Sequence, residues 1–352
     1  MNKKLSEQEV LDEADPSPEN LSLKKQLRQA LTENKNLKMH IGDDIALFDY
    51  VKSGLKELKP YTQEKLVLGP GGKHEKKTEH QAVFIVTDAH CEESVKSEEM
   101  EGACSYDWAT FEARMQEATN KCIEITTMMR QSVEVTECHV FYLGDWFCGQ
   151  IHPIEQGFGT SLTMPVALPS ASVVVAEQVM QLSKIFTKVN VWGLCGNHGR
   201  DTPKMVTKMM ADRNWDMSVY LMAREYSRAQ KNVFWNIPQS IMAVAPVMNW
   251  KCLLTHGNTA KRGGGDPILG VARMLEAQHK QRRTGTGDFD FAYVGHWHTD
   301  SMLNGDCTIC PSLIGSSQFS RYLMHASTPA GAMLYFFTEK HGRTCTWRLN
   351  LE

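Results

Sequence analysis

Short apolar runs alternate with longer amphipathic stretches from about residue 80 to the end of the chain. The run at 83–86, Val-Phe-Ile-Val, is typical of a strand buried on both faces of a sheet. Four further runs predict strands in the same way, at 140–143, 189–194, 252–255 and 291–294. The tail predicts a closing pair of strands, at 332–337 and 344–349.

The amphipathic stretches between these runs predict helices. The clearest has one apolar face, formed by Trp108, Phe111, Met115, Ala118, Cys122, Ile125 and Met129. Such a stripe is the core-facing side of a long helix and needs no cofactor to explain it. Two more helices are expected at 173–186 and 267–279. The alternation of strands and helices predicts an α/β domain with buried sheets over residues 81–352.

The first 80 residues have a different character. Residues 1–20 are acidic and polar and are expected to be disordered. Within 21–60, apolar residues fall alternately four and three apart, with Asn34 at an a-type heptad position. This helical extension is either a short coiled coil that pairs two chains into a homodimer, or an amphipathic helix packed on its own domain. Residues 61–80 are expected to be a linker.

Composition indicates a globular protein with no general affinity for polyanions. Hydrophobic residues make up 42% of the chain and charged residues 22%, and the formal net charge is −3. Nucleic acid would therefore have to be met by local patches or metal ions. The chain has no apolar run of membrane-spanning length and no signal peptide, so we expect a cytoplasmic protein with no membrane partner. Its ten cysteines are then expected to be reduced thiols.

Polar clusters directly follow five of the predicted strands. They are Asp88-Ala89-His90, Gly144-Asp145, Gly196-Asn197-His198, His256-Gly257 and Gly295-His296-Trp297-His298. Strand ends on one edge of an α/β sheet converge in space, so we expect these side chains to meet. Residues two apart on an extended segment project to the same side, which would let both members of Asp-x-His and His-x-His face one metal cluster.

The donor types in these clusters indicate the kind of ligand. Carboxylate, amide oxygen and imidazole together suit divalent ions such as Mn²⁺, Fe²⁺ or Zn²⁺. Each cluster alone is a weak signal, because a Gly-Asp pair or a loop histidine is usually ordinary turn chemistry. Five clusters, each placed after a strand, form a strong joint signal.

In this order the five clusters resemble the signature blocks of the calcineurin-like metallophosphoesterase superfamily, over roughly residues 80–350. The resemblance implies two packed mixed β-sheets flanked by helices in four layers, α/β/β/α, with two divalent ions at one edge. Both ions are expected to be Mn²⁺, with Fe²⁺ or Zn²⁺ as alternatives. One ion would be held by Asp88, His90, Asp145 and His298. The other would be held by Asp145, Asn197, His256 and His296, so that Asp145 bridges the two.

The same resemblance assigns a catalytic role to His198. It would face the scissile phosphate and stabilise or protonate the leaving oxygen, while the two ions activate a water. A structural histidine behind the ligands is the alternative. Arg200 is a candidate phosphate contact, because a guanidinium fork matches phosphate oxygens, or else an ordinary exposed arginine.

Departures from the family pattern narrow the subclass. Phosphoprotein phosphatases carry a further Asp and Arg shortly after the Gly-Asp block. Here Trp146-Phe147-Cys148-Gly149 follows Asp145 with neither, so the Asp that would orient the catalytic histidine is missing and that activity is disfavoured. The Gly-Asp-Trp-Phe block is similar to that of repair exonucleases, although Gly199 stands where those usually have an acidic residue and Cys148 where they often have His. The Gly-Asn-His-Gly-Arg form, with a charged N-terminal helix, is similar to bacteriophage phosphoesterases.

The sequence therefore predicts a phosphoesterase that hydrolyses phosphodiester bonds, with DNA or another nucleic acid as substrate. Two alternatives stay open. The chain could act on small phosphate esters or nucleotides, or it could be a metal-binding scaffold with vestigial activity.

Overall fold

The computed structural model describes residues 77–149, 159–202, 204–205, 208–261, 267–323 and 328–351, together with Lys25 and Gln29. The chain divides into two compact units, Met1–Lys73 and His74–Glu352. The first unit is described only at Lys25 and Gln29, which are exposed and helical. The disorder expected at 1–20, the heptad seam within 21–60 and most of the linker at 61–80 lie outside the described residues.

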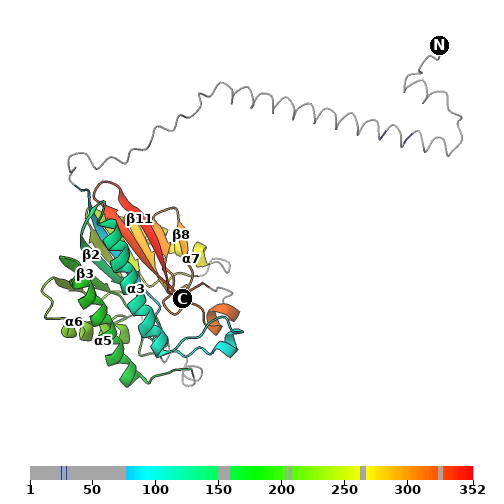
Figure 1. Ribbon diagram of the computed structural model, residues 1–352. Coiled ribbons are helices and arrows are strands. Elements are labelled where there is room, and N and C mark those ends of the chain that lie inside the picture. The colour runs from blue at the N-terminus through cyan, green and yellow to red at the C-terminus, as the bar shows by residue number, and fades with distance from the viewer. Residues whose placement is uncertain are drawn as a thin grey trace, which may run out of the picture. The chain divides into compact units, whose positions relative to one another are not determined.

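The second unit is built on two β-sheets (Figure 1). The six-stranded sheet has the order β11–β10–β1–β2–β3–β4, with β1 Glu79–Val86, β2 Glu134–Tyr142, β3 Lys188–Gly193, β4 Val233–Asn236, β10 Gly331–Thr338 and β11 Gly342–Asn350. The five-stranded sheet has the order β5–β6–β7–β9–β8, with β5 Met242–Val247, β6 Trp250–Thr255, β7 Phe291–Val294, β8 Ser301–Leu303 and β9 Cys307–Ile309. Both sheets combine parallel and antiparallel pairs.

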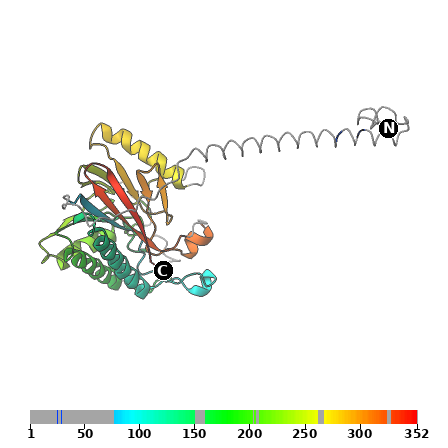
Figure 2. The same ribbon diagram turned by 45° about the horizontal axis from the view of Figure 1, so that its top comes forward.

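Helices flank the pair of sheets. They are α3 Trp108–Met129, α5 Met164–Ser183, α6 Trp215–Tyr226 and α7 Pro267–Arg283, with the short turns η1 Ser97–Met100 and η2 Phe319–Leu323. In Figure 2, α3 and α5 lie on the outer side of the six-stranded sheet, and α7 lies beyond the five-stranded sheet. The predicted fold class, two mixed sheets flanked by helices in an α/β arrangement, is confirmed.

The alternation of side chains along β1 explains how the layers hold together. Phe84 belongs to the apolar core under α3 and α5, whereas Val83 and Ile85 belong to the core between the sheets. Both faces of the strand are thus buried, as a continuous apolar run requires. On the far side, Val271 of α7 packs against the five-stranded sheet and forms a third, smaller core.

The long predicted helix agrees with the structure, whereas the second helix begins earlier than its pattern indicates. The side chain of Asp107 caps α3 by accepting from Thr110 N at 2.8 Å. Helix α5 begins at Met164 rather than near 173 and continues through Pro169. A proline inside a helix removes a hydrogen bond. Burial of Ala167 and Ala171 against the core holds this first part of the helix in place. None of the helices in the described part of the chain has the length and apolar character of a membrane span.

A close contact fixes α6 against the end of β3. A Cβ atom added at Gly193 would lie 2.6 Å from Cγ of the Tyr220 ring. The ring is fully buried, and its hydroxyl donates to the carbonyl oxygen of Leu194 at 2.7 Å. Tyr220 therefore has no room to retreat, and only glycine fits at this position.

We predict that Gly193→Ala lowers the free energy of unfolding by about 1–3 kcal/mol, because the new methyl group overpacks the β3–α6 contact. Urea denaturation followed by circular dichroism measures the change. Gly285→Ala is the matched control, since nothing lies within 4 Å of a Cβ added at that exposed glycine. Equal midpoints for the two variants would contradict the prediction.

Candidate metal centre

The five polar clusters follow strands whose ends lie at the same edge of each sheet. Strands β1, β2 and β3 are parallel neighbours in one sheet, and β6 and β7 are parallel neighbours in the other. Two contacts join the sheets at this edge. His296 N donates to both carboxylate oxygens of Asp88, at 3.1 and 3.0 Å, and His256 Nδ1 donates to the carbonyl oxygen of Leu143 at 2.9 Å.

The backbone is left-handed rather than extended at five of the seven candidate ligands, which corrects one expectation from the sequence. Positive φ angles occur at 52° for Asp88, 44° for His90, 55° for Asp145, 72° for His296 and 46° for His298. A residue with a Cβ pays roughly 1–2 kcal/mol in this left-handed region. Hydrogen bonds between neighbouring loops hold it there, including Asp88 N to Gly144 O at 3.0 Å and His90 N to Asp145 O at 3.1 Å. Tight turns, rather than an extended segment, aim these side chains.

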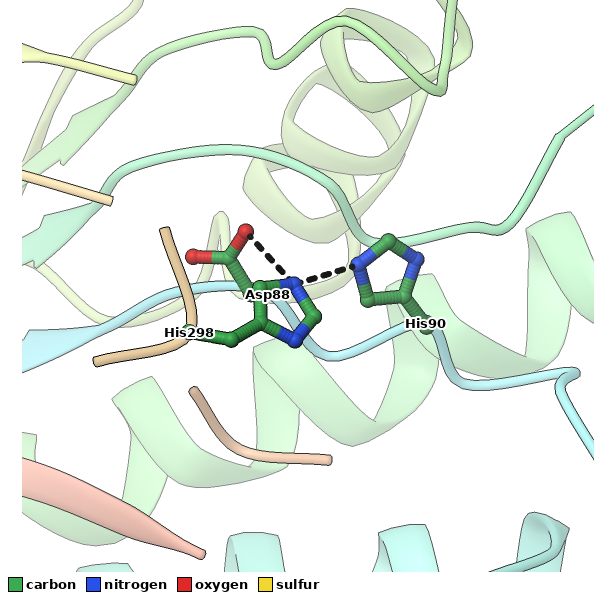
Figure 3. A group of neighbouring side chains, drawn as sticks. All are labelled: Asp88, His90 and His298. Carbon is green, nitrogen blue, oxygen red and sulfur yellow. Dashed lines mark hydrogen bonds and ion pairs between the residues drawn. The ribbon is translucent and has the colours of Figure 1, made fainter. Parts of the chain in front are cut away.

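Asp88, His90 and His298 form the first group of side chains able to hold a metal ion (Figure 3). Nε2 of His298 lies 3.4 Å from Oδ1 of Asp88 and 3.3 Å from Nε2 of His90. Asp88 is fully buried, and its other oxygen, Oδ2, accepts from Thr87 Oγ1 at 2.6 Å. This carboxylate is held in one orientation before any cation arrives.

Asp145, His256 and His296 form the second group. Nε2 of His256 lies 2.9 Å from Oδ2 of Asp145 and 3.1 Å from Oδ1 of Asn197. Because Nδ1 of His256 donates to a backbone carbonyl, Nε2 is the nitrogen that faces the carboxylate and amide oxygens. Asn197 thus approaches the second group, as its predicted role as a ligand requires. That Asp145 bridges two ions stays a prediction.

The electrostatics of the two groups suit cations. Burial disfavours charge on every member, yet His256 holds the pKa of Asp145 well below its usual value, and Asp145 raises the pKa of His256 to about 9. Burial lowers the pKa of both His90 and His296 to about 3. Without a metal ion, a proton therefore lies between the Asp145 carboxylate and the His256 imidazole. A bound cation would take the place of this proton. Donor types and positions both fit divalent metal ions.

His198 lies beside the first group, with its ring edge-on to that of His90 at 4.9 Å between centroids. Its Nδ1 donates to the carbonyl oxygen of Cys148 at 2.8 Å, which fixes the orientation of the ring. A backbone carbonyl, rather than a side chain, thus orients this histidine. The structure puts His198 near the candidate ligands but outside both groups, as the role predicted for it requires.

Arg200 lies at a hollow that Asn197 also lines, with Met205, Met210 and Ile241 among its neighbours. Its Nε donates to the carbonyl oxygen of Thr202 at 3.0 Å. Burial lowers the pKa of this guanidinium, which is therefore partly withdrawn from solvent. Arg200 is half-buried, and its contact with phosphate stays a prediction.

Asp216 is an organising residue that the sequence pattern did not reveal. The carboxylate is fully buried in the first turn of α6 and accepts three backbone N–H groups, from Asp145 at 2.9 Å, Trp146 at 3.1 Å and Gly196 at 2.8 Å. Burial and the nearby charge of Asp145 raise the pKa of Asp216 to about 7. One side chain thereby ties the loop after β2 to the loop after β3.

The position of Asp216 also explains why residue 199 is glycine. A Cβ at Gly199 would lie 2.4 Å from Oδ1 of Asn214 and 2.8 Å from Oδ1 of Asp216. Asn214 caps α6 by accepting from Asp216 N at 3.0 Å. The start of α6 occupies the space that a larger residue at 199 would need. The Asn-Trp-Asp sequence at 214–216 carries a helix-start signal, but nothing in it indicates which loops the carboxylate reaches.

Comparisons with known proteins leave the family open. No family model and no curated protein matches the chain. Among solved structures, it is similar to zinc-complexed Vps29 from Entamoeba histolytica, with 12% identity over 77% of this chain and 99% of that one, at a TM-score of 0.30. Vps29 from Cryptosporidium parvum matches with 14% identity over 76% of this chain and 96% of that one, at a TM-score of 0.29. The sulfate thiohydrolase SoxB from Thermus thermophilus matches with 9% identity over 81% of this chain and 58% of that one, at a TM-score of 0.31. Matches this weak carry no argument about function, so the case depends on the geometry of the chain itself.

We predict that Asp216→Asn weakens divalent-metal binding about 10- to 100-fold, because an amide NH₂ would confront the backbone donors that the carboxylate now satisfies. Titration calorimetry with Mn²⁺ measures the affinity. The control is Asp212→Asn, at an exposed aspartate just before the helix. Unchanged affinity in a folded Asp216→Asn protein would show that Asp216 does not position the ligands.

Proposed function

We propose that this chain is a two-metal phosphoesterase that hydrolyses phosphodiester bonds in nucleic acid, with DNA as the leading substrate. The observation that carries the proposal is the meeting of two carboxylate–imidazole groups, drawn from loops on both sheets, with His198 beside them. The ordered Asp, Asn and His clusters of the sequence support the same assignment. Pairing of two chains through residues 21–60 stays a prediction.

In this proposal the metal ligands, His198 and Arg200 have separate roles. Bound in the two groups, divalent cations would supply Lewis acidity and an ionised water near neutral pH. Asp145 is held in place by His198 N, which donates to Oδ1 at 2.7 Å. The Nδ1 contact of His198 leaves Nε2 as the nitrogen suited to face the phosphate, where a protonated ring stabilises charge or protonates the leaving oxygen. Arg200 lines the same hollow as Asn197, which supports a role in contacting phosphate oxygens.

The basic residues near the end of α7 do not contribute to the proposal. Lys280 pairs with Glu276 at 2.7 Å, and Arg283 pairs with Asp288 at 3.4 Å. These pairs and the favourable position of cations at a helix C-terminus account for the basic stretch locally. Recognition of a nucleic-acid backbone is therefore assigned to the metal centre and Arg200.

We predict that the full chain with Mn²⁺ hydrolyses bis-p-nitrophenyl phosphate and labelled DNA, whereas p-nitrophenyl phosphate is a poor substrate. Single- and double-stranded DNA are tested separately by gel electrophoresis, and chelation by EDTA should abolish turnover. A preference for the monoester would replace this proposal with the small-ester alternative. Metal binding without turnover of any of these substrates would favour the scaffold.

A second prediction separates catalysis from metal binding. His198→Ala should retain metal and lower kcat about 10²- to 10⁴-fold, because only the contact with the reacting phosphate is lost. Asp145→Ala should lose metal as well as activity. Metal content is measured by plasma mass spectrometry, with His341→Ala as the control at an exposed histidine. If His198→Ala released metal as readily as Asp145→Ala, the division of roles would be wrong.

A further inference from the structure

A third group of potential metal ligands lies next to the two already described, and it alone contains sulfur. His90, Glu93 and Cys148 each offer a ligand atom, and these atoms lie within 4.8 Å of one another. Sγ of Cys148 is 3.2 Å from Oε2 of Glu93. Neither Glu93 nor Cys148 belongs to the ligand set that the sequence predicted.

The backbone holds this third group in a defined arrangement. Glu93 N donates to the carbonyl oxygen of His90 at 2.9 Å, so these two ligands belong to one turn after β1. Cys148 lies in the loop after β2, where the next residue, Gly149, donates its N–H to the buried carboxylate of Glu92 at 3.0 Å. The Cys148 side chain is only 6% exposed. The three donors therefore come from two loops that are each tied down.

A second observation points to a ligand at this place. Nδ1 of His90 is buried and has no hydrogen-bond partner among the described residues, while Nε2 of the same ring faces His298. A buried polar atom without a partner destabilises the fold, and native structures rarely contain one without a reason. The His90 ring thus directs Nε2 at the first group and keeps a second, buried nitrogen that is able to bind a further ligand.

The donor set selects the class of that ligand. A thiolate, an imidazole and a carboxylate match the preferences of Zn²⁺ and of Co²⁺ in its place, whereas Mn²⁺ and Mg²⁺ prefer oxygen-rich surroundings. A hydrogen bond from the thiol to Glu93 alone would account for the Cys148 contact. It would not account for the unsatisfied nitrogen of His90.

We propose that His90, Glu93 and Cys148 bind a third, sulfur-ligated cation of the Zn²⁺ class beside the predicted pair. On binding, the Cys148 thiol releases its proton to solvent and a sulfur–metal bond forms. The His90 ring, which also belongs to the first group, releases its remaining N–H proton to solvent and bridges the two cations as an imidazolate, with no change of oxidation state. Because the carbonyl oxygen of Cys148 accepts from His198, this cation anchors the residue that orients the predicted catalytic histidine. The inference concerns metal binding and stands independently of the substrate.

Cobalt substitution of the full chain tests the proposal. The Co²⁺-loaded protein should show a near-ultraviolet thiolate-to-cobalt charge-transfer band, since none of the other predicted ligands is a sulfur atom. The band should disappear in Cys148→Ser and persist in Cys195→Ser, a buried cysteine outside all three groups. No band in the wild-type protein, or a band that survives in Cys148→Ser, would overturn the proposal.

Two further measurements make the test independent of how the variants fold. X-ray absorption of the Zn²⁺-loaded wild-type protein should show a sulfur neighbour at about 2.3 Å. Native mass spectrometry should count three Zn²⁺ ions per chain, and two in a folded Cys148→Ser. A zinc environment of nitrogen and oxygen alone would reject the third site. A sulfur-ligated ion in a protein that cleaves no phosphodiester would reject the proposed function and leave this inference standing.

Discussion

The whole candidate centre depends on the conformation of Asp145. The carbonyl oxygen of Asp145 accepts from His90 N, and its own N–H donates to the Asp216 carboxylate. Its carboxylate accepts from His198 N and faces Nε2 of His256. One residue with a φ of 55° thus contacts the loops after β1, β3 and β6 and the start of α6. Any change that releases this turn would separate the two groups of ligands, because both sheets meet there.

Close approach of the strand ends makes this arrangement possible and excludes side chains from it. A Cβ at Gly144 would lie 2.1 Å from Gly196 N, and a Cβ at Gly196 would lie 2.1 Å from Oδ1 of Asp145. The loops after β2 and β3 are in direct backbone contact, so glycine is required at both positions. The three apolar cores oppose the cost of the left-handed residues and buried charges, and bound cations would reduce it further.

The sequence predicted what local pattern can encode. The strands that carry the ligands and the long helix α3 follow from apolar runs and periodicity, and the convergence of the five clusters follows from where those strands end. The pattern alone indicated an α/β domain with buried sheets, and the arrangement in two packed sheets came only from the family resemblance. Helix α6 and the role of Asp216 did not emerge, because a buried carboxylate that reaches 71 residues back to Asp145 leaves no local trace. The left-handed turns at Asp88 and His90 were missed for a related reason. Contacts between loops impose them against the intrinsic preference of the residues.

Residues distant in the sequence set the surroundings of His198 and Gly199. The carbonyl oxygen of Cys148 orients the His198 ring, and Asp216 occupies space next to Gly199. An acceptor for the histidine and a carboxylate for the loop backbone are thus supplied by different loops. Chemistry of this kind depends on where atoms lie rather than on which residue supplies them.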